Sequence, residues 1–155
     1  MGHPIPPGHH VLTPHLVIKG AADAIDFYKQ AFGAQEVSRM SMPGSDRIGH
    51  AELQFGDSKL FLAEEFPDYG AIAPGASSPV TIHLYSTDAD DTFATAVRAG
   101  ATVSMPLMDA PWGDRFGKLI DPYGHHWSIS EHIEDLTREQ IEERMAAAFG
   151  GPPCE

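Results

Sequence analysis

The sequence has a single cysteine, Cys154, which lies one residue from its end. A lone cysteine cannot form a disulfide within the chain, and it argues against a thiolate metal site or a buried cysteine nucleophile. Positive charge is also scarce, because 10 Lys and Arg against 22 Asp and Glu give a formal net charge of −12. An acidic surface repels nucleic acids and anionic membranes, so neither is expected as a partner.

Long hydrophobic runs are missing as well. No apolar stretch approaches the roughly 20 residues that a membrane-spanning helix needs, and no basic segment followed by an apolar one opens the chain. We therefore expect a cytoplasmic protein. Its 155 residues, of which 42% are hydrophobic, suit one domain with a substantial core.

The sequence does contain a repeated turn. MPGSDRIG at 42–49 and APWGDRFG at 110–117 share a proline, Asp-Arg and a glycine, each 68 positions apart. The same offset relates Thr13 to Thr81, His15 to His83, Leu16 to Leu84 and Gly56 to Gly124. Repeated matches at one offset predict a duplicated half-domain.

Both copies show the same predicted order of elements, which is one strand, one helix and three strands. In the first copy the strands are expected at 15–18, 35–42, 47–55 and 58–64, and the helix at 21–33. In the second copy the strands are expected at 80–86, 102–108, 115–121 and 126–131, and the helix at 88–100. Asp88 is a suitable N-cap for the second helix, and Gly33 suits the end of the first.

The predicted half-domains span 11–65 and 80–132, joined by a linker rich in Pro, Gly and Ser at 66–79. A further helix is predicted at 135–149, where Thr137 and Gln140 have the spacing of a capping box. Its apolar face consists of Leu136, Ile141, Met145 and Phe149. This face is expected to pack across a sheet edge or on a partner subunit.

A tandem βαβββ chain with the helices AIDFYKQAFGA and DADDTFATAVRAGA, and with DPYGHHWSI before the last strand, resembles the vicinal oxygen chelate superfamily. That group includes glyoxalase I, bleomycin-resistance proteins and extradiol dioxygenases. VLTPHLVIKGAADAIDFYKQAFGA, WGDRFGKLIDPYGHHWS and HIEDLT are most similar to its PhnB-like branch. The resemblance spans roughly 11–148. It implies a single glyoxalase-like domain over 1–155 of α+β class, in which the half-domains form an incomplete barrel of mixed β-sheet around one cavity, with helices outside.

Metal-dependent members of this superfamily take a histidine from the first strand and a glutamate from the last strand of a half-domain. Matched residue by residue, these positions fall on Thr13, Leu60, Thr81 and Ser128. None of the four is a usual metal ligand. The resemblance therefore implies a non-standard or absent metal site, with either no cofactor or a divalent ion such as Zn, Ni, Fe or Mn.

Histidines and carboxylates nearby are the candidate replacements. His15 and His83 lie two residues beyond Thr13 and Thr81, so strand alternation predicts that both imidazoles face the shared cavity. They are candidate catalytic groups or metal ligands, or else a structural pair bonded to backbone.

His50 and Glu52 share a strand face and are a candidate metal pair or acid–base pair, although a salt-bridged exposed strand would look the same. Glu64 is the candidate replacement carboxylate and catalytic group. Its strand position predicts the same face as Leu60 and Leu62.

Four residues are candidate substrate contacts: Tyr85, Trp112, Arg115 and Trp127. An arginine can clamp a carboxylate or phosphate, and aromatic rings can line a pocket. Alternatively, the repeated Asp-Arg closes a turn, and the aromatic residues belong to the core.

Two functions remain open. One is a homodimeric protein that binds a small molecule in the cavity between half-domains. The other is a metal-dependent lyase or isomerase of glyoxalase type that acts on a small oxygenated substrate.

Overall fold

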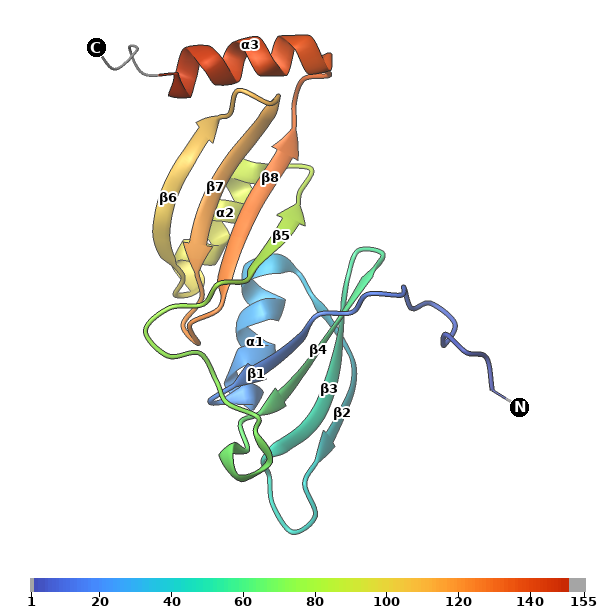
Figure 1. Cartoon of the computed structure of the whole chain (residues 1–155). Coiled ribbons are helices and arrows are strands. Elements are labelled where there is room, and N and C mark those ends of the chain that lie inside the picture. Colours follow the sequence, from blue (N-terminus) through green and yellow to red (C-terminus); the bar gives the residue numbers. More distant parts are fainter. Residues whose placement is uncertain (1, 151–155) are drawn as a thin grey trace.

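The computed structural model of the chain describes residues 2–150 (Figure 1). The first half-domain contains β1 (His15–Ile18), α1 (Ala21–Phe32), β2 (Gln35–Ser41), β3 (Ile48–Phe55) and β4 (Ser58–Glu64). The linker includes a short 3-10 helix, η1 (Pro67–Tyr69). The second half-domain contains β5 (Thr81–Tyr85), α2 (Ala89–Ala99), β6 (Thr102–Asp109), β7 (Asp114–Ile120) and β8 (His126–His132), and α3 (Arg138–Phe149) follows it. The predicted order of elements is confirmed.

The two half-domains have the same sheet topology. The strand orders are β1-β4-β3-β2 and β5-β8-β7-β6, with the first pair of each sheet parallel and the others antiparallel. These are two separate mixed sheets and do not close into a barrel. The predicted α+β fold of tandem βαβββ units is confirmed.

One face of each sheet is covered by a helix, and α1 and α2 also pack against each other. The alternation of buried residues identifies this face, because Leu16 and Ile18 of β1 and Leu60 and Leu62 of β4 are at most 5% exposed. Residues from both half-domains contribute to one continuous hydrophobic cluster. We call the covered side of each sheet its helix face and the opposite side its outer face.

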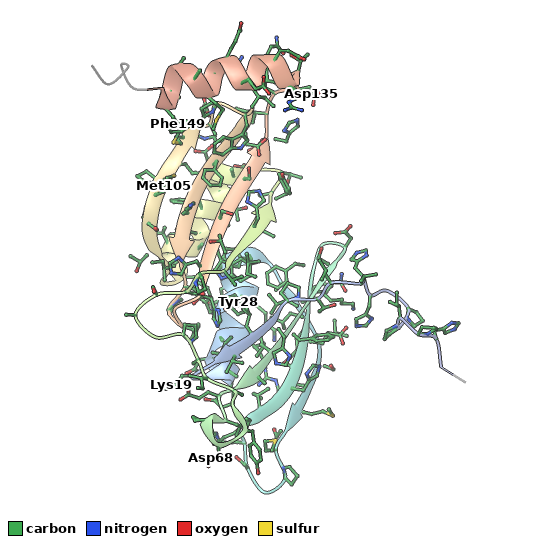
Figure 2. The ribbon with its side chains drawn as sticks, viewed as in Figure 1. Lys19, Tyr28, Asp68, Met105, Asp135 and Phe149 are labelled. Carbon is green, nitrogen blue, oxygen red and sulfur yellow. The ribbon has the colours of Figure 1, made fainter. Side chains whose placement is uncertain are left out.

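A buried carboxylate joins the two half-domains. Asp121, in the turn before β8, accepts hydrogen bonds from the Tyr28 hydroxyl of α1 at 2.5 Å and from Trp127 Nε1 at 2.9 Å. It also accepts the backbone N–H groups of Tyr123 and His125, each at 2.9 Å. Burial and the neighbouring carboxylate raise the pKa of Tyr28 well above its usual range, so its hydroxyl stays protonated and donates. Tyr28 lies where the half-domains meet (Figure 2).

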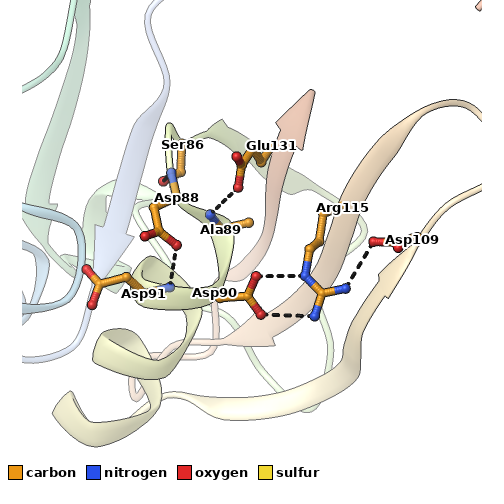
Figure 3. Close-up of polar contacts among 8 residues, drawn as sticks. All are labelled: Ser86, Asp88, Ala89, Asp90, Asp91, Asp109, Arg115 and Glu131. Carbon is orange, nitrogen blue, oxygen red and sulfur yellow. Dashed lines mark hydrogen bonds and ion pairs between the residues drawn. The ribbon is translucent and has the colours of Figure 1, made fainter. Parts of the chain in front are cut away.

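The N-terminus of α2 is stabilised by two carboxylates (Figure 3). Asp88 accepts the N–H of Asp91 at 3.0 Å, which confirms its predicted role as N-cap. Glu131 of β8 accepts the N–H of Ala89 at 2.9 Å. Negative charge at a helix N-terminus is favourable because it compensates free N–H groups and the helix dipole.

The predicted capping box of α3 is confirmed, since Thr137 and Gln140 each accept the other's backbone N–H. The helix lies at the far end of the second half-domain, beyond the tips of β6 and β7 (Figure 1). Its apolar face is poorly covered, with Phe149 64% exposed and Met145 36% exposed. Among residues 2–150, no helix is long and apolar enough to cross a membrane.

Candidate functional site

Four rings form a continuous row across the outer face of the second sheet. The Trp112 and Phe116 rings are 5.2 Å apart, Phe116 and His83 are 6.1 Å apart, and His83 and Tyr85 are 4.8 Å apart, measured between centroids. Tyr85 is 66% exposed at one end of the row. The structure thus brings together three of the predicted site residues, His83, Tyr85 and Trp112. We call these four rings the ring row.

His83 is held in place by a serine. Its Nδ1 lies 2.6 Å from the Oγ of Ser128, a buried residue on the neighbouring strand β8. This bond fixes the imidazole orientation and leaves Nε2 as the ring nitrogen for another partner. The sequence also allowed a structural histidine bonded to backbone, but the partner of His83 Nδ1 is a side-chain hydroxyl.

The outer face of the first sheet carries a second group of rings, centred on Phe61. The His50, His9 and His15 rings lie 4.8, 5.9 and 6.5 Å from the Phe61 ring, and His15 and His50 are 6.2 Å apart. Burial and the neighbouring His50 lower the pKa of His15, so its neutral form is favoured. A neutral imidazole offers one donor and one acceptor.

Glu52 is engaged by Lys59 and by His9. Its Oε1 lies 3.0 Å from Lys59 Nζ and 3.3 Å from His9 Nε2. The hydrogen bond from Lys59 is the main cause that lowers the pKa of this carboxyl. The arrangement corresponds to the salt-bridged strand that the sequence also allowed.

His15 and His83 do not line a common cavity within one chain. His15 borders a hollow of about 320 Å³ together with linker residues, whereas His83 borders a separate hollow of about 540 Å³. Both do lie on outer faces, as strand alternation predicted. The shared cavity was expected because the resemblance places both sheets around one space, but the two sheets of this chain are separate.

A metal does not fit the residues of a single chain. Within the described range 2–150, no group of three or more His, Cys, Asp or Glu side chains is arranged to hold a metal ion. His15 and His50 come close to each other, but Glu52 is engaged by Lys59. We therefore derive no chemistry through a metal.

The strand register corrects the family-based position in β4. His83 of β5 pairs with Ser128 of β8, whereas the equivalent His15 of β1 pairs with Phe61 of β4. The last strands are related by an offset of 67, whereas the first strands are related by 68. Phe61 therefore takes the place of Ser128, and His15 lacks the serine anchor that His83 has.

Glu64 shares a face with Leu60 and Leu62, as predicted, but this is the helix face and not the side that His15 occupies. Its carboxylate accepts the N–H groups of Gly20 and Ala21 at 2.9 Å each. It is the counterpart of Glu131 at the start of α2. Its carboxylate is thus used to cap a helix and does not replace a metal ligand on the outer face.

Two of the predicted substrate contacts, Trp127 and Arg115, have their polar atoms hydrogen-bonded within the protein. Trp127 is 1% exposed, and its indole N–H bonds to Asp121. Arg115 lies on the helix face, where it binds both carboxylate oxygens of Asp90 at 2.8 and 2.9 Å and Asp109 at 3.0 Å (Figure 3). The repeated Asp-Arg is thus a local structural device, and Arg115 pairs within its own half-domain.

Sequence reasoning missed a polar cluster beside the ring row. Buried Asp114 accepts the Ser130 hydroxyl at 2.8 Å and lies 2.8 Å from His132 Nδ1, whose Nε2 lies 2.8 Å from Asp135. The hydrogen bond with Asp114, followed by that with Asp135, raises the pKa of His132. Alternation along β8 places Ser128, Ser130 and His132 on one face, which was the available signal.

Comparisons with known proteins agree with the fold. A family model described as the Glyoxalase/Bleomycin resistance protein/Dioxygenase superfamily matches residues 8–129. An uncharacterized protein of Mycobacterium bovis is 40% identical over 146 residues, covering 90% of this chain and 95% of that protein. The crystal structure of TioX from Micromonospora sp. ML1 has a TM-score of 0.64 at 26% identity, covering 79% of this chain and 98% of TioX. A PhnB protein from Bacillus cereus shares the fold, with a TM-score of 0.62, 18% identity, and coverage of 79% and 99%.

Proposed function

Because the chain belongs to the glyoxalase/bleomycin resistance protein/dioxygenase superfamily, we propose that it binds a small molecule on the outer face of its second half-domain, against the ring row. The observation that carries the proposal is the anchored imidazole of His83, which lies between Tyr85 and Phe116. Aromatic side chains with a few placed polar groups are typical of ligand sites.

The ring row defines the chemistry of the ligand. A flat ring would stack against Tyr85 or Trp112, and a hydroxyl or carbonyl group would bond to Nε2 of His83. The net charge of −12 favours a neutral or cationic molecule over an anion. The proposed role is binding, with a non-standard or absent metal site.

The proposal includes a cytoplasmic homodimer. Both outer faces are open in a single chain, so a second copy would enclose them. Exposed Met145 and Phe149 on α3 supply apolar surface that a dimer would cover. Fully burying such side chains would stabilise the contact by roughly 1.5–3 kcal/mol each.

A ligand panel tests the site. Thermal unfolding of the full chain is measured with neutral and cationic aromatic compounds, because a ligand that binds the folded state raises the melting temperature. We expect His83→Ala and Tyr85→Ala to remove the shift, and Ser128→Ala to reduce it. His3→Ala, in the exposed N-terminal segment, is the matched control and should leave it unchanged. Shifts that persist in both His83→Ala and Tyr85→Ala would contradict the proposed site.

A further inference from the structure

The two half-domains form two equivalent crevices, each where a hairpin turn of one half-domain meets the end of the first strand of the other. In one, the β7–β8 turn at Tyr123 and Gly124 lies across from Lys19, just after β1. In the other, the β3–β4 turn at Phe55 and Gly56 lies across from Thr87, just after β5. Each residue of the second set is related to one of the first by the offset of 68.

The two crevices differ because the linker lines the first crevice and not the second. The linker runs through the first, where Pro74 lies so close to Gly124 that a Cβ on that glycine would meet the proline ring at 3.2 Å. At the equivalent Gly56, no atom would lie within 4 Å of such a Cβ among the described residues. The chain has only one linker, so duplication left the second crevice without the ring that covers the first.

The second crevice has an apolar floor and a polar rim, and His10, Leu12 and Pro14 of the N-terminal segment border it. Its volume is about 540 Å³, within the range of small-molecule sites. The floor includes the clustered rings of Phe32, Phe55 and Trp127, whose centroids are 4.7 to 6.3 Å apart. Ser58 of the first half-domain and Thr87 of the second half-domain contribute hydroxyl-bearing side chains to its lining.

We propose that this crevice, which His83 and Tyr85 of the ring row border on one side, binds an uncharged aromatic molecule carrying a hydroxyl group on a floor that lies beyond the ring row. An aromatic ring would pack on the floor in the way that the Pro74 ring packs on the opposite side. Its hydroxyl would bond to the rim. Charged molecules are disfavoured because the apolar floor cannot compensate the loss of their hydration.

The two tryptophans of the chain separate this site from the ring row. Trp127 lines the crevice, whereas Trp112 belongs to the ring row. The full chain, labelled with ¹⁵N, is titrated with 2-naphthol, and the two indole N–H signals are followed by NMR after assignment with Trp112→Phe. We expect a saturable shift of the Trp127 signal and of backbone amides near Gly56 and Thr87. The anion 2-naphthoate should shift neither.

Variants that fill the crevice complete the test. Thr87→Phe is expected to weaken the Trp127 response at least tenfold, and Ser58→Phe, in the lining contributed by the other half-domain, is a second variant with the same expected effect. Ser104→Phe, on the exposed edge strand β6, is the matched control. A naphthol response confined to Trp112 would overturn the crevice site while leaving the ring-row proposal intact. A Trp127 response that survives both filling variants, or no saturable response at Trp127, would also overturn it.

Discussion

The Tyr28 hydroxyl on α1 donates a 2.5 Å hydrogen bond to the carboxylate of Asp121, which lies 93 residues further along the chain in the other half-domain. A second contact crosses the same boundary, because Nε2 of His125 lies 2.9 Å from the carbonyl oxygen of Val17. The turn DPYGHHW is therefore the structural joint between the half-domains.

Removing the hydroxyl at this joint should destabilise the fold. We expect Tyr28→Phe to lower the free energy of unfolding by about 1.5–3 kcal/mol, the usual worth of a hydrogen bond to a charged acceptor. The ring remains, so packing is preserved. Urea unfolding measures the change, and Tyr69→Phe, at an 87% exposed position, is the control that should have almost no effect. Equal stabilities of Tyr28→Phe and the unaltered protein would show that the bond contributes nothing net.

The glutamates at the two helix N-termini should be equivalent in effect. We expect Glu64→Ala and Glu131→Ala each to cost about 0.5–2 kcal/mol, as the loss of an N-terminal cap does. Glu143→Ala, within exposed α3, should cost less than either. Chemical denaturation of the three variants tests this. A loss of ligand response without a loss of stability in Glu64→Ala would instead support the catalytic or binding role that the sequence suggested.

Stability should depend on pH through His132. Its hydrogen bonds with Asp114 and Asp135 raise its pKa in the folded protein above the unfolded value of about 6.5. The stabilisation is therefore fully present below that value and is lost as pH rises through the folded pKa. We expect the stability difference between the unaltered protein and His132→Gln to be largest near pH about 5.5 and to shrink towards pH about 9. Urea unfolding measured across this pH range tests the prediction, with His3→Gln as the control. A stability difference between the unaltered protein and His132→Gln that grows with pH would contradict it.

The proposed dimer depends on α3. Light scattering at micromolar concentration should give twice the single-chain mass of 16.8 kDa. Removal of residues 135–155 should give a monomer, because the exposed apolar side chains of α3 go with it. A mass near 16.8 kDa for the full chain would end the dimer proposal. A dimer that persists after the truncation would show that the chain dimerises without α3.

The fold was predictable because its signals are local and repeated. The helix ending at Gly33, the N-cap at Asp88 and the capping box at Thr137 each depend on neighbours a few residues away. The common offset of 68 then predicted that both halves have the same topology. Strand alternation also placed His15 and His83 on corresponding faces.

The site was less predictable because it depends on register and on contacts between distant segments. A one-residue difference between β4 and β8 made Phe61, rather than Leu60, the counterpart of Ser128, and the face that Glu64 shares with Leu60 and Leu62 is the one toward α1. Nothing local in the sequence marks that shift. Trp127 was also ambiguous, since its burial depends on Asp121 and on Tyr28 from the other half-domain.

The side-chain joint between the half-domains has a consequence for the continuity of the polypeptide. Each half-domain has its own sheet and helix, and Tyr28, Asp121 and His125 connect them without using the linker. The linker exposes Tyr69 to 87% and Ile72 to 68%, and exposed loops of this kind are preferred sites of proteolytic cleavage. Cleavage there would leave two fragments that still hold each other through this joint. The same contacts would let the two half-domains, expressed as separate chains, associate as a heterodimer. Fragment complementation would thus reproduce the state that preceded the fusion of the two repeated halves.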